Sequence, residues 1–94
     1  MDKNDLTERI KNTSRLLYQN REYEGLEAAL KLLSEFQNMI QQLTDEQLKN
    51  GGQFALLMMK ELLDGYHSQD MLGIADCLME KSLLFVQFII ETSR

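Results

Sequence analysis

The stretch Phe54-Ala-Leu-Leu-Met-Met-Lys-Glu-Leu-Leu63 is apolar at eight of its ten positions. A helix with so much apolar surface must be buried on more than one side. The whole chain has no proline and is rich in residues with high helix propensity, among them Leu, Glu, Lys, Gln and Ala. We therefore expect an all-α protein in which this stretch forms the middle of one helix.

Apolar residues at helical spacing predict three more helices around this stretch. The four expected helices cover about residues 6–19, 23–43, 53–66 and 71–92. Thr44-Asp-Glu-Gln47 has the spacing of a capping box, which favours a further helical turn at that point. The strongest break in the chain is expected at Asn50-Gly51-Gly52, because paired glycines disfavour a helix.

The two halves of the chain share one plan: a helix, a short polar turn and a second, longer helix with a glycine near its start. An offset of 48 residues aligns Tyr18 with Tyr66 and Gly25 with Gly73. We predict a single domain over residues 1–94, a four-helix bundle made of two similar antiparallel helical hairpins at about 5–44 and 53–92. In the second helix we expect Leu30 on the core face, and in the last helix we expect two apolar stripes.

The charge of the chain argues against nucleic acid and anionic membranes as partners. The net charge is −5, and the whole excess of acid lies after Gly25. Binding to phosphate groups needs a basic surface, which this sequence does not provide. The longest apolar run, Leu83 to Ile90, is too short to span a bilayer, and the polar start does not resemble a signal peptide. We therefore expect a cytoplasmic protein.

Few residues could carry chemistry. His67 is the only histidine and is expected in a turn, and Cys77 is the only cysteine and is expected in the core. A catalytic triad needs a nucleophile, a base and an orienting group, and a di-iron bundle needs two histidines. The acidic pairs Asp76–Glu80 and Glu61–Asp64 are interpreted as solvated. We expect no catalytic residue, no metal site and no cofactor, and hence no enzyme.

The last two predicted helices carry more apolar residues than a single four-helix core needs, which is typical of an interface. We expect a non-enzymatic interaction or structural module that forms a homodimer through these helices. The alternative is a small chaperone or adaptor, flagellar or secretion-related, that binds an amphipathic helix of a partner in an open, methionine-lined groove. The candidate interface residues are Met58, Met59, Met79, Leu83, Leu84, Val86, Phe88 and Ile90.

Two segments carry a family resemblance. Leu17-Tyr-Gln-Asn-Arg-Glu-Tyr-Glu-Gly-Leu26 resembles a "Phe-Tyr-x-Gly-Asn…Glu-Gly" helix start, and the segment from Leu62 to Glu80 resembles an "Asp-Tyr-x-x-x-Ala-Asp-x-Leu-x-x-Glu" stretch. Both occur in small uncharacterised helical proteins of Firmicutes-type bacteria, some of them linked to flagellar or motility genes. The resemblance implies a bacterial helical protein without a known activity. The matching positions are Tyr18, Gly25, Asp70, Ala75, Asp76, Leu78 and Glu80, while Met71 and Gly65 depart from the pattern.

Overall fold

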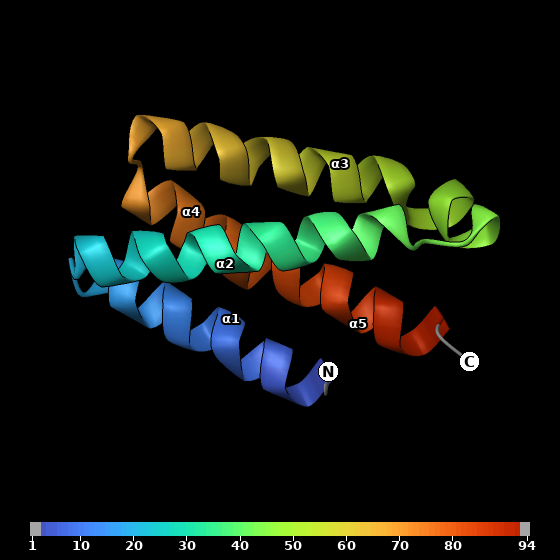
Figure 1. Ribbon diagram of the computed structural model, residues 1–94, viewed down its shortest axis with the longest axis horizontal. Helices are drawn as coiled ribbons and strands as arrows, with labels where there is room; N and C mark the ends of the chain where they lie inside the picture. Colours follow the sequence, from blue (N-terminus) through green and yellow to red (C-terminus); the bar gives the residue numbers. More distant parts are fainter. Residues whose placement is uncertain (1–2, 93–94) are drawn as a thin grey trace.

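The computed structural model describes residues 3–92, with side chains placed for residues 5–92, and folds them into a four-helix bundle (Figure 1). The first three helices are α1 (Lys3–Tyr18), α2 (Glu22–Gln41) and α3 (Asp45–Ser68). The fourth runs on through α4 (Met71–Cys77), a π-helical segment η1 (Leu78–Ser82) and α5 (Leu83–Thr92). Each helix packs against the next, and α1 closes the bundle against α4 and α5. The predicted bundle of two antiparallel hairpins is confirmed.

The turn between α1 and α2 and the turn between α3 and α4 have the same backbone structure. Asn20 and Gln69 both adopt a left-handed conformation, with φ of 60° and 56°. In each turn the next N–H donates to the carbonyl oxygen five residues back, over 3.0 Å from Arg21 and over 2.8 Å from Asp70. The two turns are therefore equivalent at an offset of 49 residues, one more than the offset that aligns the identical residues.

Helix α3 begins at Asp45, eight residues earlier than the sequence predicts, and the predicted break at Asn50-Gly51-Gly52 is wrong. The predicted capping box is present: Thr44 Oγ1 accepts from the Gln47 N–H over 3.1 Å, and Gln47 Oε1 accepts from the Thr44 N–H over 2.9 Å. Gln47 also donates to Thr92 Oγ1 over 2.7 Å and so ties the start of α3 to the end of α5. These contacts offset the low helix propensity of the glycines, and the second hairpin covers residues 45–92.

The core lies between all four helices. Phe36 of α2 and Phe85 of α5 meet edge to face within it, with ring centroids 6.0 Å apart. Around this pair the buried apolar residues are Leu6, Ile10, Leu17, Ala29, Leu32, Leu33, Ala55, Met58, Leu62, Ile74, Ala75, Cys77, Leu78, Val86 and Ile89.

The π-helical segment η1 lies where the fourth helix would otherwise lose its register with the core. Ile74, Leu78, Ser82 and Val86 follow at steps of four residues, and all are at most 1% exposed. In a regular α-helix each such step rotates the side chain by about 40° away from the core. The wider turn of η1 compensates for this rotation. The second apolar stripe predicted for this helix consists of Leu72, Met79, Leu83, Val86 and Ile90. Of these, Val86 is buried and Leu83 is half-buried against the core, whereas the other three are exposed.

Candidate interaction surface

The structure divides the eight predicted interface residues by exposure. Met58 and Val86 are 0% and 1% exposed. The prediction is therefore wrong for these two, because both point into the core that their helices share. Three more pack half-buried against the core, namely Met59, Leu83 and Phe88. The exposed members are Leu84 at 59%, Ile90 at 42% and Met79 at 39%.

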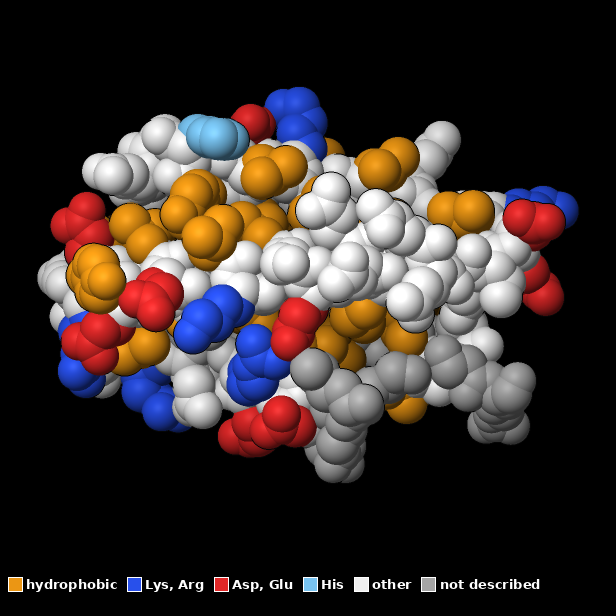
Figure 2. Space-filling view, viewed as in Figure 1, with side chains coloured by type: hydrophobic (Ala, Val, Ile, Leu, Met, Phe, Trp, Pro, Cys, Tyr) orange, Lys and Arg blue, Asp and Glu red, His pale blue; other side chains and the backbone are white. Residues whose placement is uncertain are grey.

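A more continuous apolar surface lies between α2 and α3. It forms a groove of about 490 Å³. Figure 2 shows apolar side chains gathered along this face, between the two helices. Leu30 of α2 is 50% exposed there, and Leu63 of α3 is 41% exposed. The groove is lined by Leu30, Leu33, Ser34, Gln37, Met59, Leu63, Tyr66 and His67.

Sequence reasoning missed most of this groove. Leu30 was expected on the core face of its helix, but the buried face of α2 is centred on Ala29, Leu33 and Phe36. Leu30 lies on the edge of that face, towards α3. The usable signal was the apolar stretch from Phe54 to Leu63, whose second side, with Met59 and Leu63, faces α2 in the groove.

The residues that line this groove include no carboxylate, lysine or arginine. On α2, Glu27 and Lys31 lie 3.8 Å apart and line a different groove, which lies between α1 and α2. On α3, Asp64 follows Leu63 and accepts from Lys60 Nζ over 2.9 Å. This hydrogen bond raises the pKa of Lys60. All four side chains are more than half exposed, and none of them lines the groove between α2 and α3.

The outer face of the fourth helix has a different charge. Its exposed apolar residues Leu72, Met79, Leu84 and Ile90 alternate with acids. Asp76, Glu80 and Glu91 are all exposed, and Lys81 is the one base between residues 71 and 92. Lys81 Nζ lies 3.0 Å from Glu61 Oε2. The hydrogen bond to Glu61 raises the pKa of Lys81. This apolar surface is therefore acidic.

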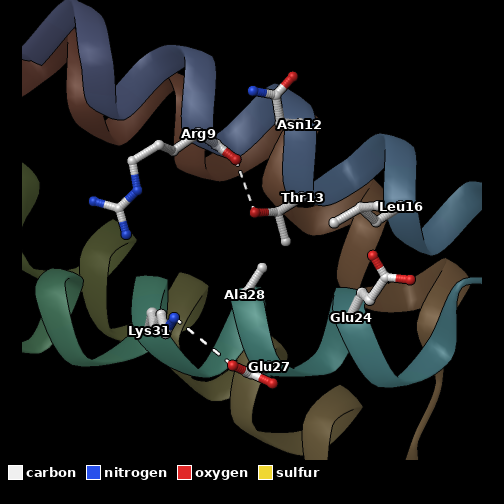
Figure 3. A pocket seen from close by; sticks show the side chains of 8 residues that line it. All are labelled: Arg9, Asn12, Thr13, Leu16, Glu24, Glu27, Ala28 and Lys31. Carbon is white, nitrogen blue, oxygen red and sulfur yellow. Dashed lines mark hydrogen bonds and ion pairs between the residues drawn. The ribbon is translucent and has the colours of Figure 1, made fainter.

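A second groove, of about 320 Å³, lies between α1 and α2 (Figure 3). Arg9 and Glu24 lie at its opposite ends, with Thr13 between them. Its charged groups are engaged within the chain: Arg9 Nη1 donates to both carboxylate oxygens of Glu35, over 2.6 and 2.7 Å. Arg21 binds Glu24 over 2.8 Å. Lys31 and Glu27 also line this groove and lie 3.8 Å apart, so its charged side chains form ion pairs within the chain.

The residues that could carry chemistry lie apart or are already bonded. Cys77 is 4% exposed, and its Sγ donates to the Met58 carbonyl over 3.8 Å. Burial raises the pKa of this thiol to about 11, so it is protonated at neutral pH. His67 is exposed at the end of α3. Cys77 lies in the core as the sequence predicts, whereas the prediction of a turn at His67 is wrong, because α3 continues to Ser68.

The carboxylates are likewise dispersed. Asp76 accepts from the Tyr18 hydroxyl over 2.6 Å, which links α1 to α4 and raises the pKa of Tyr18. Within residues 5–92 no three His, Cys, Asp or Glu side chains come together in a way that could hold a metal ion. Nor does any helix in the described part of the chain combine the length and apolarity needed to cross a membrane.

No family model matches this chain. No curated protein and no solved structure matches it significantly either. The resemblance to small bacterial helical proteins, with its flagellar link, therefore stays a prediction. The described surface itself offers an apolar groove between α2 and α3, an acidic apolar face on the fourth helix and a second groove between α1 and α2.

Proposed function

We propose that this protein is a non-enzymatic interaction module that docks another protein surface in the groove between α2 and α3. The observation that supports the proposal is the exposure of Leu30 and Leu63, at 50% and 41%, on opposite sides of one apolar groove. A contiguous apolar surface bordered by polar residues is typical of a docking site. The buried, protonated Cys77 thiol gives no support to an enzyme.

The proposal moves the interface from the last two helices, where the sequence predicts it, to α2 and α3. Two of the predicted interface residues belong to the core, and those that remain exposed on the fourth helix lie among acids. Of the predicted interface residues, we keep Met59 of α3, because it lines the groove. Leu30, from the first hairpin, replaces the residues of the last helix.

A second candidate is the adaptor that receives an amphipathic helix. The observation in its favour is Met59, because a flexible thioether beside an open groove can adapt to more than one partner. In this candidate the groove stays open in the free protein and is filled only by the partner. We place it second, because Met59 is the one observation that favours it.

A dye that fluoresces on apolar surfaces tests the docking proposal, together with the mass of the protein in the same sample. We expect the dye to bind where the protein is monomeric and to be displaced where the groove is covered. Leu63→Gln should reduce dye binding. Leu72→Gln on α4 should reduce it less, although Leu72 is the more exposed of the two leucines. A monomer that does not bind the dye would overturn the proposal.

A further inference from the structure

The outer side of the fourth helix carries a straight line of exposed residues. Its inner side is buried at steps of four residues, because η1 compensates for the rotation of these steps, through Ile74, Leu78, Ser82 and Val86. The same steps, taken two residues earlier, must therefore also stay on one side of the helix. They lead through Leu72, Asp76, Glu80 and Leu84, which are all exposed. Two residues turn a helix by about 200°, so this outer line lies opposite the core.

The outer line is apolar at both ends and acidic in the middle. Leu72 and Leu84 are 58% and 59% exposed. Asp76 and Glu80 lie between them, one helical turn apart. The carboxylates separate the two leucines, so the outer line is not a contiguous apolar surface like the groove between α2 and α3. A partner that covers both leucines must also accommodate two negative charges.

The chain itself does not neutralise these two charges. No ion pair among the described residues includes Asp76 or Glu80. Asp76 accepts a hydrogen bond from the uncharged hydroxyl of Tyr18. The one base between residues 71 and 92 is Lys81, and its Nζ lies 3.0 Å from the Glu61 carboxylate. The acidic middle of the outer line is therefore open to cations from outside the chain.

We infer that the outer line docks a helix of another protein that carries two basic side chains between two apolar ones. This surface lies outside the groove of the proposed function and consists of different residues. Rows of side chains at steps of four residues are the ridges by which helices pack against one another. The twelve residues from Leu72 to Leu84 span about 18 Å, which matches three to four turns of a partner helix. The apolar ends supply the burial, and the opposite charges set the register and the direction of the partner.

The charges of the outer line argue against other occupants. A second copy of this chain, placed outer line against outer line, would bring the carboxylates of both copies together. Nucleic acids and anionic bilayers are repelled for the same reason. A helix with apolar residues alone would cover the carboxylates without pairing them, which costs more than the burial of two leucines gains.

Synthetic helices test the inference with the full chain. The probe is a fluorescent peptide of about 18 residues with the pattern Leu-x-x-x-Lys-x-x-Lys-x-x-x-Leu, which places the four side chains in a line on a regular helix. The matched peptide has Glu in place of both Lys residues. Fluorescence anisotropy at physiological salt measures the dissociation constants. We expect the lysine peptide to bind and the glutamate peptide to bind at least roughly tenfold more weakly.

Charge reversal on the protein locates the site. Glu80→Lys should raise the dissociation constant of the lysine peptide by roughly tenfold and lower that of the glutamate peptide. Glu27→Lys, an equal charge change in the groove between α1 and α2, should change neither, because salt screens distant exposed charges. Leu84→Gln should also weaken the lysine peptide by roughly tenfold, through lost burial. Circular dichroism of each variant establishes that the bundle is folded.

The inference is overturned if the lysine peptide does not bind the wild type. It is also overturned if Glu80→Lys and Glu27→Lys weaken binding equally, since the attraction would then follow the net charge alone. Leu63→Gln in the groove between α2 and α3 should leave peptide binding unchanged. A loss of binding in Leu63→Gln would place the peptide in that groove, which would contradict this inference and support the docking proposal.

Discussion

Gly65 and Ile74 pack directly against one another across the turn between α3 and α4. A β-carbon added to Gly65 would lie 2.8 Å from Cγ1 of Ile74. The first hairpin has the same close contact, but here the glycine lies on the second helix. A β-carbon on Gly25 of α2 would lie 2.7 Å from Cδ2 of Leu17 in α1. In each hairpin, a glycine on one helix lets the other approach closely just beyond the turn.

Gly65→Ala should therefore lower the free energy of unfolding by about 1 kcal/mol or more, because the overpacking cost exceeds the gain in helix propensity. Gly52→Ala is the matched control. Gly52 is also helical, but a β-carbon there meets nothing closer than 3.5 Å, so this change should stabilise by about 0.5–1 kcal/mol. Urea denaturation of both variants measures the difference. Equal effects of the two changes would show that the approach of Ile74 does not constrain residue 65.

The start of α3 depends on the capping box at Thr44. Thr44→Ala should lower the free energy of unfolding by about 1 kcal/mol. It should also speed hydrogen exchange of the amides in residues 45–52, because this segment starts at the cap and contains the glycine pair. Thr44→Ser keeps the accepting oxygen and should behave nearly as the wild type. If exchange in residues 45–52 is equally fast in all three proteins, the cap does not hold this part of α3.

Ser82 carries a buried hydroxyl that has no hydrogen-bond partner among the described residues. Ser82→Ala should raise the free energy of unfolding by about 1 kcal/mol, because it removes an unsatisfied polar group. Ser14 is equally buried, but its hydroxyl donates to the Ile10 carbonyl over 3.0 Å. Ser14→Ala should lower stability by about 0.5–1.5 kcal/mol. A loss of stability in both variants would mean that the Ser82 hydroxyl has a partner in solution.

Stability should fall at alkaline pH through Cys77. The pKa of its thiol is 9.0 in its ordinary state and about 11 in the fold, because burial disfavours the thiolate. As the pH rises, the thiol of the unfolded chain therefore loses its proton before the thiol of the folded chain does. The stability that the protonated thiol contributes is complete below pH 9 and is lost as the pH rises to about 11. Over this pH range the free energy of unfolding falls by about 2–3 kcal/mol.

The comparison that isolates this effect is with Cys77→Ala, measured by denaturation at a series of pH values. The variant keeps the tyrosines and lysines that also titrate at high pH, so only the difference between the two curves belongs to the thiol. The wild type should lose stability more steeply above pH 9. Parallel curves would show that the thiol is not shielded from water.

The fold was largely predictable from the sequence, because helix propensity and apolar spacing agree over most of the chain. Residues 23–43 and 71–92 were placed within a few residues of α2 and of the fourth helix. The glycine pair at residues 51 and 52 was not predictable in this way. Its helical state depends on the cap at Thr44 and on the contact of Gln47 with Thr92, which is 45 residues away.

The candidate surface was less predictable for a related reason. Periodicity shows that a helix has apolar sides, but it does not show which neighbour covers each side. Met58 and Val86 were assigned to an interface because the last two helices carry surplus apolar residues, and the register of the bundle placed both in the core. Leu30 has the spacing of a core residue, but it lies at the edge towards α3 and remains half exposed.

The most direct test of the central claim is the binding of a dye that fluoresces on apolar surfaces to three proteins at the same micromolar concentration, with the mass of each measured by sedimentation. These are the wild type, Leu63→Gln in the groove between α2 and α3, and Leu72→Gln on the exposed face of α4. We predict that the dye binds the monomeric wild type and Leu72→Gln, and that Leu63→Gln, although folded, binds it less. Dye binding that persists in Leu63→Gln and is lost in Leu72→Gln would contradict the account.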